Sequence, residues 1–99
     1  MASKTAELID KLTINYEENG ILKVREKEKH VLSKGAWTTI MFLYEEYNPK
    51  DEVYNAPKVS IRRFKKVGDD YRKQSQFNIS SEKQAKEIAK QLKEWYGNE

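Results

Sequence analysis

The chain has no cysteine and only one histidine in 99 residues. The absence of cysteine excludes disulfides, thiolate nucleophiles and cysteine-based metal sites, and it is compatible with a reducing compartment. His30 stands alone in a charged run, where a solvated histidine is far more common than a general base or a metal ligand. The chain also lacks a glycine-rich phosphate loop. We therefore expect a protein that is not an enzyme and has no metal, cofactor or small-molecule substrate.

Long apolar runs are missing as well. No stretch approaches the roughly 18 apolar residues of a membrane span, and residues 1–11 lack the apolar core of a signal peptide. We therefore expect a cytoplasmic protein without a membrane partner. The length suits one domain with a modest core, and no disulfides are available to reinforce it. Homodimerisation is therefore expected.

The net charge of +3 is unevenly distributed. Residues 1–20 carry two lysines and four acids, which gives −2, whereas residues 48–77 carry eight basic and four acidic residues, which gives +4. The positive excess therefore lies in one segment, and a polyanionic partner would be expected there.

Alternating apolar and polar side chains predict an antiparallel sheet preceded by an N-terminal arm, residues 1–20, with at most a short helical turn. The predicted strands are residues 21–32, 37–47, 58–64 and 71–79. A helix stays an alternative for residues 21–32, because Glu, Lys and Arg favour helices. As a strand, this segment places Lys23, Arg25, Lys27 and Lys29 on one face as a basic ladder.

Residues 81–96 predict an amphipathic helix. Ser81 and Gln84 form a capping-box pattern, and Gly97 is placed to end the helix. Apolar residues recur at helical spacing and indicate a hydrophobic partner, which is either the sheet or the helix of another subunit. The residues expected at a dimer interface are Ile88, Leu92 and Trp95. The predicted fold class is α+β, with the element order β-β-β-β-α in a binding domain over residues 21–99.

Basic and aromatic residues interleave in residues 57–77. The basic residues there are Lys58, Arg62, Arg63, Lys65, Lys66, Arg72 and Lys73, against two acids. Lysine and arginine attract phosphates, and aromatic faces such as that of Phe64 stack on unpaired bases at about 1–3 kcal/mol each. The segment therefore favours single-stranded nucleic acid. The alternative is a solvated hairpin whose rings lie in the core. The same choice applies to Trp37, which is either a core anchor or an exposed ring on which a base stacks.

Three motifs carry a family resemblance over about residues 21–96. They are APKVSIRRF (56–64), FNIS (77–80) and SEKQAKEIAKQL (81–92), with Gly35-Ala36-Trp37 opening the second strand. This pattern resembles the positive-cofactor-four transcriptional coactivator family, and most closely its small bacterial relatives that bind single-stranded DNA. One departure is Ser75-Gln76, where family members often have Lys-Gly.

The resemblance implies a strongly curved four-stranded antiparallel sheet, dimerised partly through the C-terminal helices, that binds single-stranded DNA with little sequence preference. Carried over by position, the residues facing nucleic acid are Trp37, Lys58, Arg62, Phe64, Lys65 and Lys66, with Lys73 nearby. We therefore expect single-stranded DNA or RNA binding by a homodimer, in transcription or DNA maintenance. The alternative is a protein-interaction module that does not bind nucleic acid.

Overall fold

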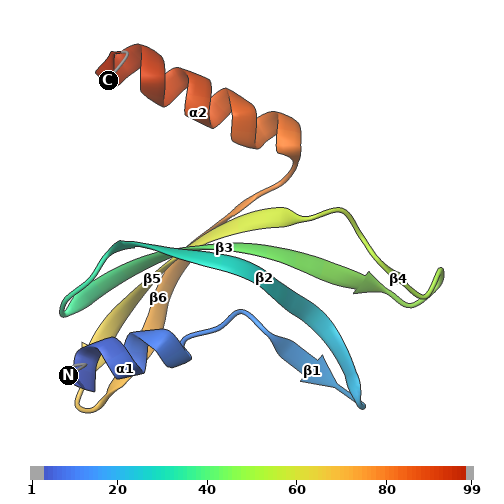
Figure 1. Cartoon of the computed structure of the whole chain (residues 1–99), viewed down its shortest axis with the longest axis horizontal. Coiled ribbons are helices and arrows are strands. Elements are labelled where there is room, and N and C mark those ends of the chain that lie inside the picture. The colour runs from blue at the N-terminus through green and yellow to red at the C-terminus, as the bar shows by residue number, and fades with distance from the viewer. Residues whose placement is uncertain (1–3, 98–99) are drawn as a thin grey trace.

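The computed structural model describes residues 4–97, which form helices on both sides of an antiparallel sheet (Figure 1). In chain order the elements are α1 (Lys4–Lys11), β1 (Tyr16–Glu18), β2 (Ile21–Ser33), β3 (Trp37–Asn48), β4 (Val53–Tyr54), β5 (Lys58–Val67), β6 (Asp70–Ile79) and α2 (Glu82–Tyr96). The predicted α+β class, the antiparallel sheet and the C-terminal helix are confirmed.

The sheet has the strand order β1-β2-β3-β5-β6, with β4 paired to the end of β3. The expectation of four strands is too low, because β1 and β4 were assigned to loops. The turn between β1 and β2 contains Asn19 and Gly20, with positive φ angles of 52° and 79°. This is the backbone that an Asn-Gly hairpin turn requires, so the sequence did contain a signal for β1.

The sheet curls into a half-barrel, and β2 is interrupted by a β-bulge (Figure 1). Between Glu26 and Glu28 the register with β3 shifts, which makes Lys27 an extra residue. Such a shift reverses the alternation of side chains between the two faces. Arg25 and Lys29 consequently lie on opposite faces. The expected basic ladder on one face is therefore wrong.

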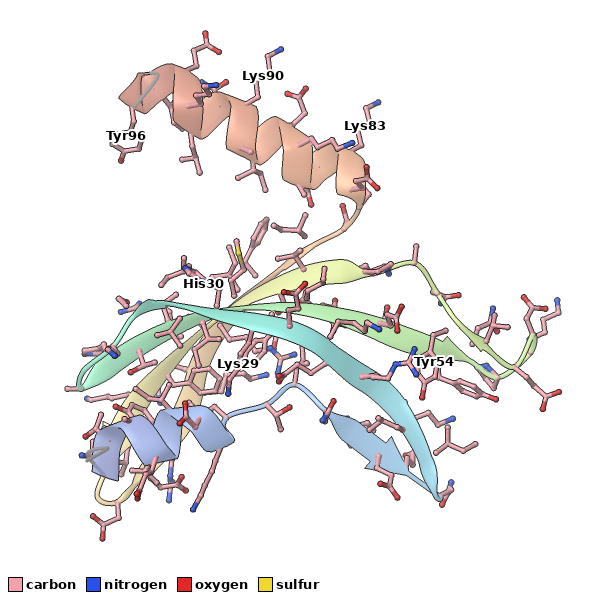
Figure 2. The ribbon with its side chains drawn as sticks, viewed as in Figure 1. Lys29, His30, Tyr54, Lys83, Lys90 and Tyr96 are labelled. Atoms are coloured by element: carbon pink, nitrogen blue, oxygen red, sulfur yellow. The ribbon has the colours of Figure 1, made fainter. Side chains whose placement is uncertain are left out.

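Each face of the sheet has its own helix. We call the face toward α1 the inner face and the face toward α2 the outer face (Figure 1). Figure 2 shows Lys29 on the inner side and its neighbour His30 on the outer side. Along β3 the even-numbered residues from Thr38 to Tyr44 are buried, whereas the odd-numbered residues between them are only partly buried. The sheet therefore has its core on the inner face.

The N-terminal segment completes this core. Ile9 of α1 and Ile14 just after it are 3% and 4% exposed, and they pack in one cluster with Phe42 and Phe64. The segment expected to be a short helical turn or loose arm is thus a packed helix and linker. Because an isolated helix of this length is marginal in water, its order depends on the burial of these isoleucines.

Lys29 ties the end of α1 to the sheet. Its Nζ donates to the carbonyl oxygens of Ile9, Asp10 and Leu12 at 3.2, 2.9 and 2.7 Å. These carbonyls belong to the last turn of a helix and the residue after it, where backbone oxygens have no partner within the helix. One ammonium group therefore donates to three acceptors, of which the Ile9 carbonyl also accepts from the backbone N–H of Leu12 at 3.1 Å, and all three of its own donors are used.

The second helix begins at a side-chain cap and then runs without burying any residue. Ser81 Oγ accepts a hydrogen bond from the backbone N–H of Gln84 at 3.1 Å, as the capping pattern predicts. The Gln84 side chain reaches back to the N–H of Ser80 at 2.7 Å. No residue of α2 is buried. Among the described residues, neither helix is long and apolar enough to cross a membrane.

The contact between Lys29 and α1 generates a stability prediction. We expect Lys29→Met to lower the free energy of unfolding by about 1.5–3 kcal/mol, because several last-turn carbonyls lose a charged donor. Lys27→Met is the matched control, since Lys27 lies in the same strand, is exposed, and sits 4.0 Å from its nearest carboxylate oxygen. Urea unfolding measures both variants. Equal effects of the two substitutions would contradict the role given to Lys29.

Candidate nucleic-acid interface

The alternation of side chains divides the predicted binding residues between the two faces. Pairing of β3, β5 and β6 places four of them on the outer face: Trp37, Arg63, Lys65 and Arg72. The others lie on the inner face: Lys58, Arg62, Phe64, Lys66 and Lys73. The basic segment therefore does not form one continuous surface.

The outer set gathers around one aromatic ring. The guanidinium carbon of Arg63 lies 4.5 Å from the ring centroid of Trp37, and Nζ of Lys65 lies 5.4 Å from it. The side chain of Trp37 is 44% exposed, so it is not the core anchor that was one of its two expected roles. Arg72 pairs with Lys65 across the strands and is exposed. We call Trp37, Arg63, Lys65 and Arg72 the outer cationic cluster.

The three cations of this cluster are not paired with carboxylates of the described residues. Three like charges therefore lie near one another on an open surface, which attracts anions. The faces of the Trp37 indole are stabilised by cation–π contacts of about 0.5–1 kcal/mol at such exposed sites. That energy is small enough for a ligand ring to replace one of the cations.

The inner set is engaged within the protein. Phe64 is 6% exposed and lies in the core, which leaves its ring no free face, so its expected role as an exposed stacking residue does not fit this arrangement. Nζ of Lys66 donates to Oγ1 of Thr5 at 3.1 Å, and Nζ of Lys58 lies 3.1 Å from Oε1 of Glu46. Lys73, which is exposed, bonds only to a neighbouring glutamine side chain.

Arg62 and Tyr44 share the middle of the inner face. Burial lowers the pKa of Arg62 below its ordinary value, and its guanidinium Nε donates to Oγ of Ser60 at 3.3 Å. Burial, reinforced by the charge of Glu46, raises the pKa of Tyr44 above 10.0, although Lys58 and Arg62 act in the opposite direction. The Tyr44 hydroxyl therefore stays protonated, and it lies in a polar neighbourhood of mixed charge.

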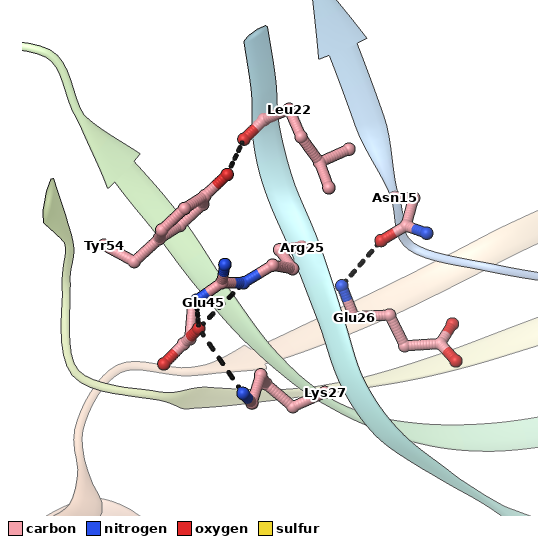
Figure 3. A network of polar contacts seen from close by, with 7 residues as sticks. All are labelled: Asn15, Leu22, Arg25, Glu26, Lys27, Glu45 and Tyr54. Atoms are coloured by element: carbon pink, nitrogen blue, oxygen red, sulfur yellow. Dashed lines mark hydrogen bonds and ion pairs between the residues drawn. The ribbon is translucent and has the colours of Figure 1, made fainter. Parts of the chain in front are cut away.

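Arg25, at the other end of the outer face, is paired with a carboxylate. Nε of Arg25 donates to Oε1 of Glu45 at 3.0 Å, and its guanidinium lies 3.7 Å from the ring centroid of Tyr54 (Figure 3). The Tyr54 hydroxyl donates to the backbone oxygen of Leu22 at 2.9 Å. This network fixes β4 against β2. The sequence did not predict this network, because Tyr54 falls in a segment expected to be a loop and its partners are distant in the chain.

The described residues offer few candidates for a metal site or a catalytic site. Within the described residues, no group of three or more His, Asp or Glu side chains could hold a metal ion. His30 is exposed beside a shallow hollow of about 340 Å³ on the outer face, next to Met41 and Glu28. The surroundings of His30 supply neither a nucleophile nor an oriented acid–base partner.

The chain was compared with protein-family models, curated proteins and solved structures, and none of these matches it. The resemblance given above therefore stays a prediction. The outer cationic cluster is the place where several residues of that prediction meet at the surface.

The pKa of Tyr44 generates a prediction for alkaline pH. Its value is raised on folding, so the folded state holds the proton more tightly than the unfolded state does. This contribution to stability is fully present below about pH 10 and is lost as the pH rises through the folded pKa. We expect Tyr44→Phe to lessen the loss of unfolding free energy between pH 8 and pH 10.5, as measured by urea titration. Parallel losses in both proteins would contradict the shift.

Proposed function

We propose that this protein binds single-stranded nucleic acid, with little sequence preference, through the outer cationic cluster. The observation that carries this proposal is the half-exposed ring of Trp37 beside two cations that lack carboxylate partners among the described residues. This indole does not pack into the core, which lies on the opposite face. It matches the pairing of stacking platform and phosphate contacts that single strands require.

The proposed binding mode exchanges one contact for another. A base stacks on the indole of Trp37 and displaces Arg63 or Lys65 from the ring face. The displaced cation then meets the backbone phosphate of the same strand, and condensed counterions are released. Every base has a π-face, so the contact does not distinguish sequences. Single-stranded DNA and RNA both supply these groups, and DNA is the ligand implied by the family resemblance.

We further propose that the protein is a homodimer that pairs through α2. The helix exposes an apolar stripe: Leu92 is 46% exposed, Trp95 73% and Tyr96 81%, with Ile88 in the same stripe. An apolar cavity of about 520 Å³ lies where the start of α2 meets Leu43 and Val59 of the outer face. In a two-fold dimer, both subunits use the same surface patch. The apolar stripe of each helix can then contact the stripe or the cavity of the other subunit. A different protein on α2 is the alternative, and it corresponds to the interaction module.

Nucleic-acid binding is tested by removing cations from the cluster. We expect Arg63→Ala combined with Lys65→Ala to weaken binding of oligo-dT about tenfold or more. The slope of log affinity against log salt becomes shallower by about 1.4, because two phosphate contacts are lost. Fluorescence anisotropy at several salt concentrations measures both quantities.

The matched control is Lys83→Ala combined with Lys90→Ala. It removes the same charge from α2, where both lysines point away from the sheet (Figure 2). Affinity and salt slope should stay near the wild-type values. No binding by the wild-type protein at micromolar concentration, or equal effects of the two double variants, would refute the proposed site.

The dimer is tested separately. We expect Leu92→Asp to convert the dimer to a monomer, because it places a charge in the centre of the apolar stripe. Size-exclusion chromatography with light scattering gives the mass of each species. The exposed residue Lys90 supplies the control, since Lys90→Asp also introduces an aspartate, on the other side of the helix, with a change in net charge that is one unit larger. A wild-type monomer, or a dimer unaffected by Leu92→Asp, would contradict pairing through α2.

A further inference from the structure

The inner face carries a second set of cations, and two of them, Lys29 and Lys66, contact the N-terminal helix. They come from strands distant in the sequence: Lys29 from β2, Lys58, Arg62 and Lys66 from β5, and Lys73 from β6. Buried among and beside them are the aromatic rings of Phe42, Tyr44, Phe64 and Tyr71. Basic and aromatic residues therefore also meet on this face, although α1 and the residues after it now cover the rings.

The covering segment offers oxygen atoms to these cations. The ammonium of Lys29 has its three hydrogen-bond donors on the carbonyls of Ile9, Asp10 and Leu12. Lys66 reaches Oγ1 of Thr5 at 3.1 Å. Carbonyls at the end of a helix carry partial negative charge. The oxygens of a phosphodiester could occupy the same positions around Lys29 and would bring a full negative charge.

The charge and the packing of the cover, which is α1 and the residues after it, both suit a segment that a nucleic-acid strand can displace. Residues 1–20 carry a net charge of −2, and four of the five inner cations come from the segment 48–77, whose net charge of +4 also counts the three cations of the outer cluster. The cover has eight helical residues, and its deeply buried anchors are Ile9 and Ile14. Removing these two side chains from the core uncovers ring faces rather than a purely aliphatic surface. A base that stacks on those rings replaces the lost packing.

We propose that the inner face is a second binding site for a single nucleic-acid strand, and that α1 competes with the strand for it. This inference rests on the proposed function. The outer cationic cluster is open and makes the first contact. The inner face becomes available when α1 leaves, and its affinity is lowered by the fraction of molecules in which the cover is closed. Phe64, which cannot stack while α1 is docked, becomes a stacking residue in the open form.

Cross-linking tests the cover directly, since the chain has no cysteine of its own. In a Thr5→Cys, Lys66→Cys variant, a bifunctional thiol reagent long enough to span these neighbours locks α1 to β5. The uncross-linked form of the same variant is the matched control. We expect locking to weaken oligo-dT binding at least fivefold in anisotropy titrations. Equal affinities of the two forms would overturn the inference.

A second variant loosens the cover. Ile9→Ala removes one of its anchors, and we expect it to bind oligo-dT severalfold more tightly than the wild-type protein, with an unchanged circular dichroism spectrum of the sheet. If Ile9→Ala does not fold, the comparison of the cross-linked and uncross-linked forms still tests the inference. Wild-type binding that responds neither to locking nor to loosening overturns the second site and leaves the outer site standing. No binding by any form overturns both proposals.

Discussion

The side-chain alternation of β3 is the constraint on which the rest of this structure depends. Hydrogen bonding to β2 on one side and β5 on the other fixes the strand, so Ile40 and Phe42 must enter the inner core while Met41 and Leu43 face outward. The pairing with β3 determines the face of every residue in β5, and the pairing of β5 with β6, which contains one register shift, determines the faces in β6. It therefore divides a basic segment that is continuous in sequence into an open cluster and a covered set.

The sequence predicted those elements whose signals are local. The cap at Ser81 and the apolar spacing after it predicted α2, and the period-two alternation of apolar side chains predicted the four long strands. β1 had a local signal in Asn19-Gly20 that was interpreted only as a turn. The docking of α1 had none, because Ile9 and Ile14 find their partners across the whole chain.

The candidate site was predictable in composition but not in arrangement. Counting charges located the basic segment, yet the face of each residue depends on register shifts in the sheet. The shift between Arg63 and Phe64 changes which residues of β6 lie opposite those of β5, and the extra residue Lys27 turns Lys29 toward α1. A bulge is decided by the fit of three strands, which no short window of sequence contains. Phe64 shows the result, since its neighbours are exposed while its ring is 6% exposed.

The central claim is that a nucleic-acid base stacks on Trp37, and the emission of this residue tests it most directly. A Trp95→Phe variant leaves Trp37 as the only tryptophan of the chain. The account predicts that oligo-dT quenches the emission of this variant to saturation and that added salt restores it. Emission that does not change while anisotropy reports binding would place the strand elsewhere and contradict the account.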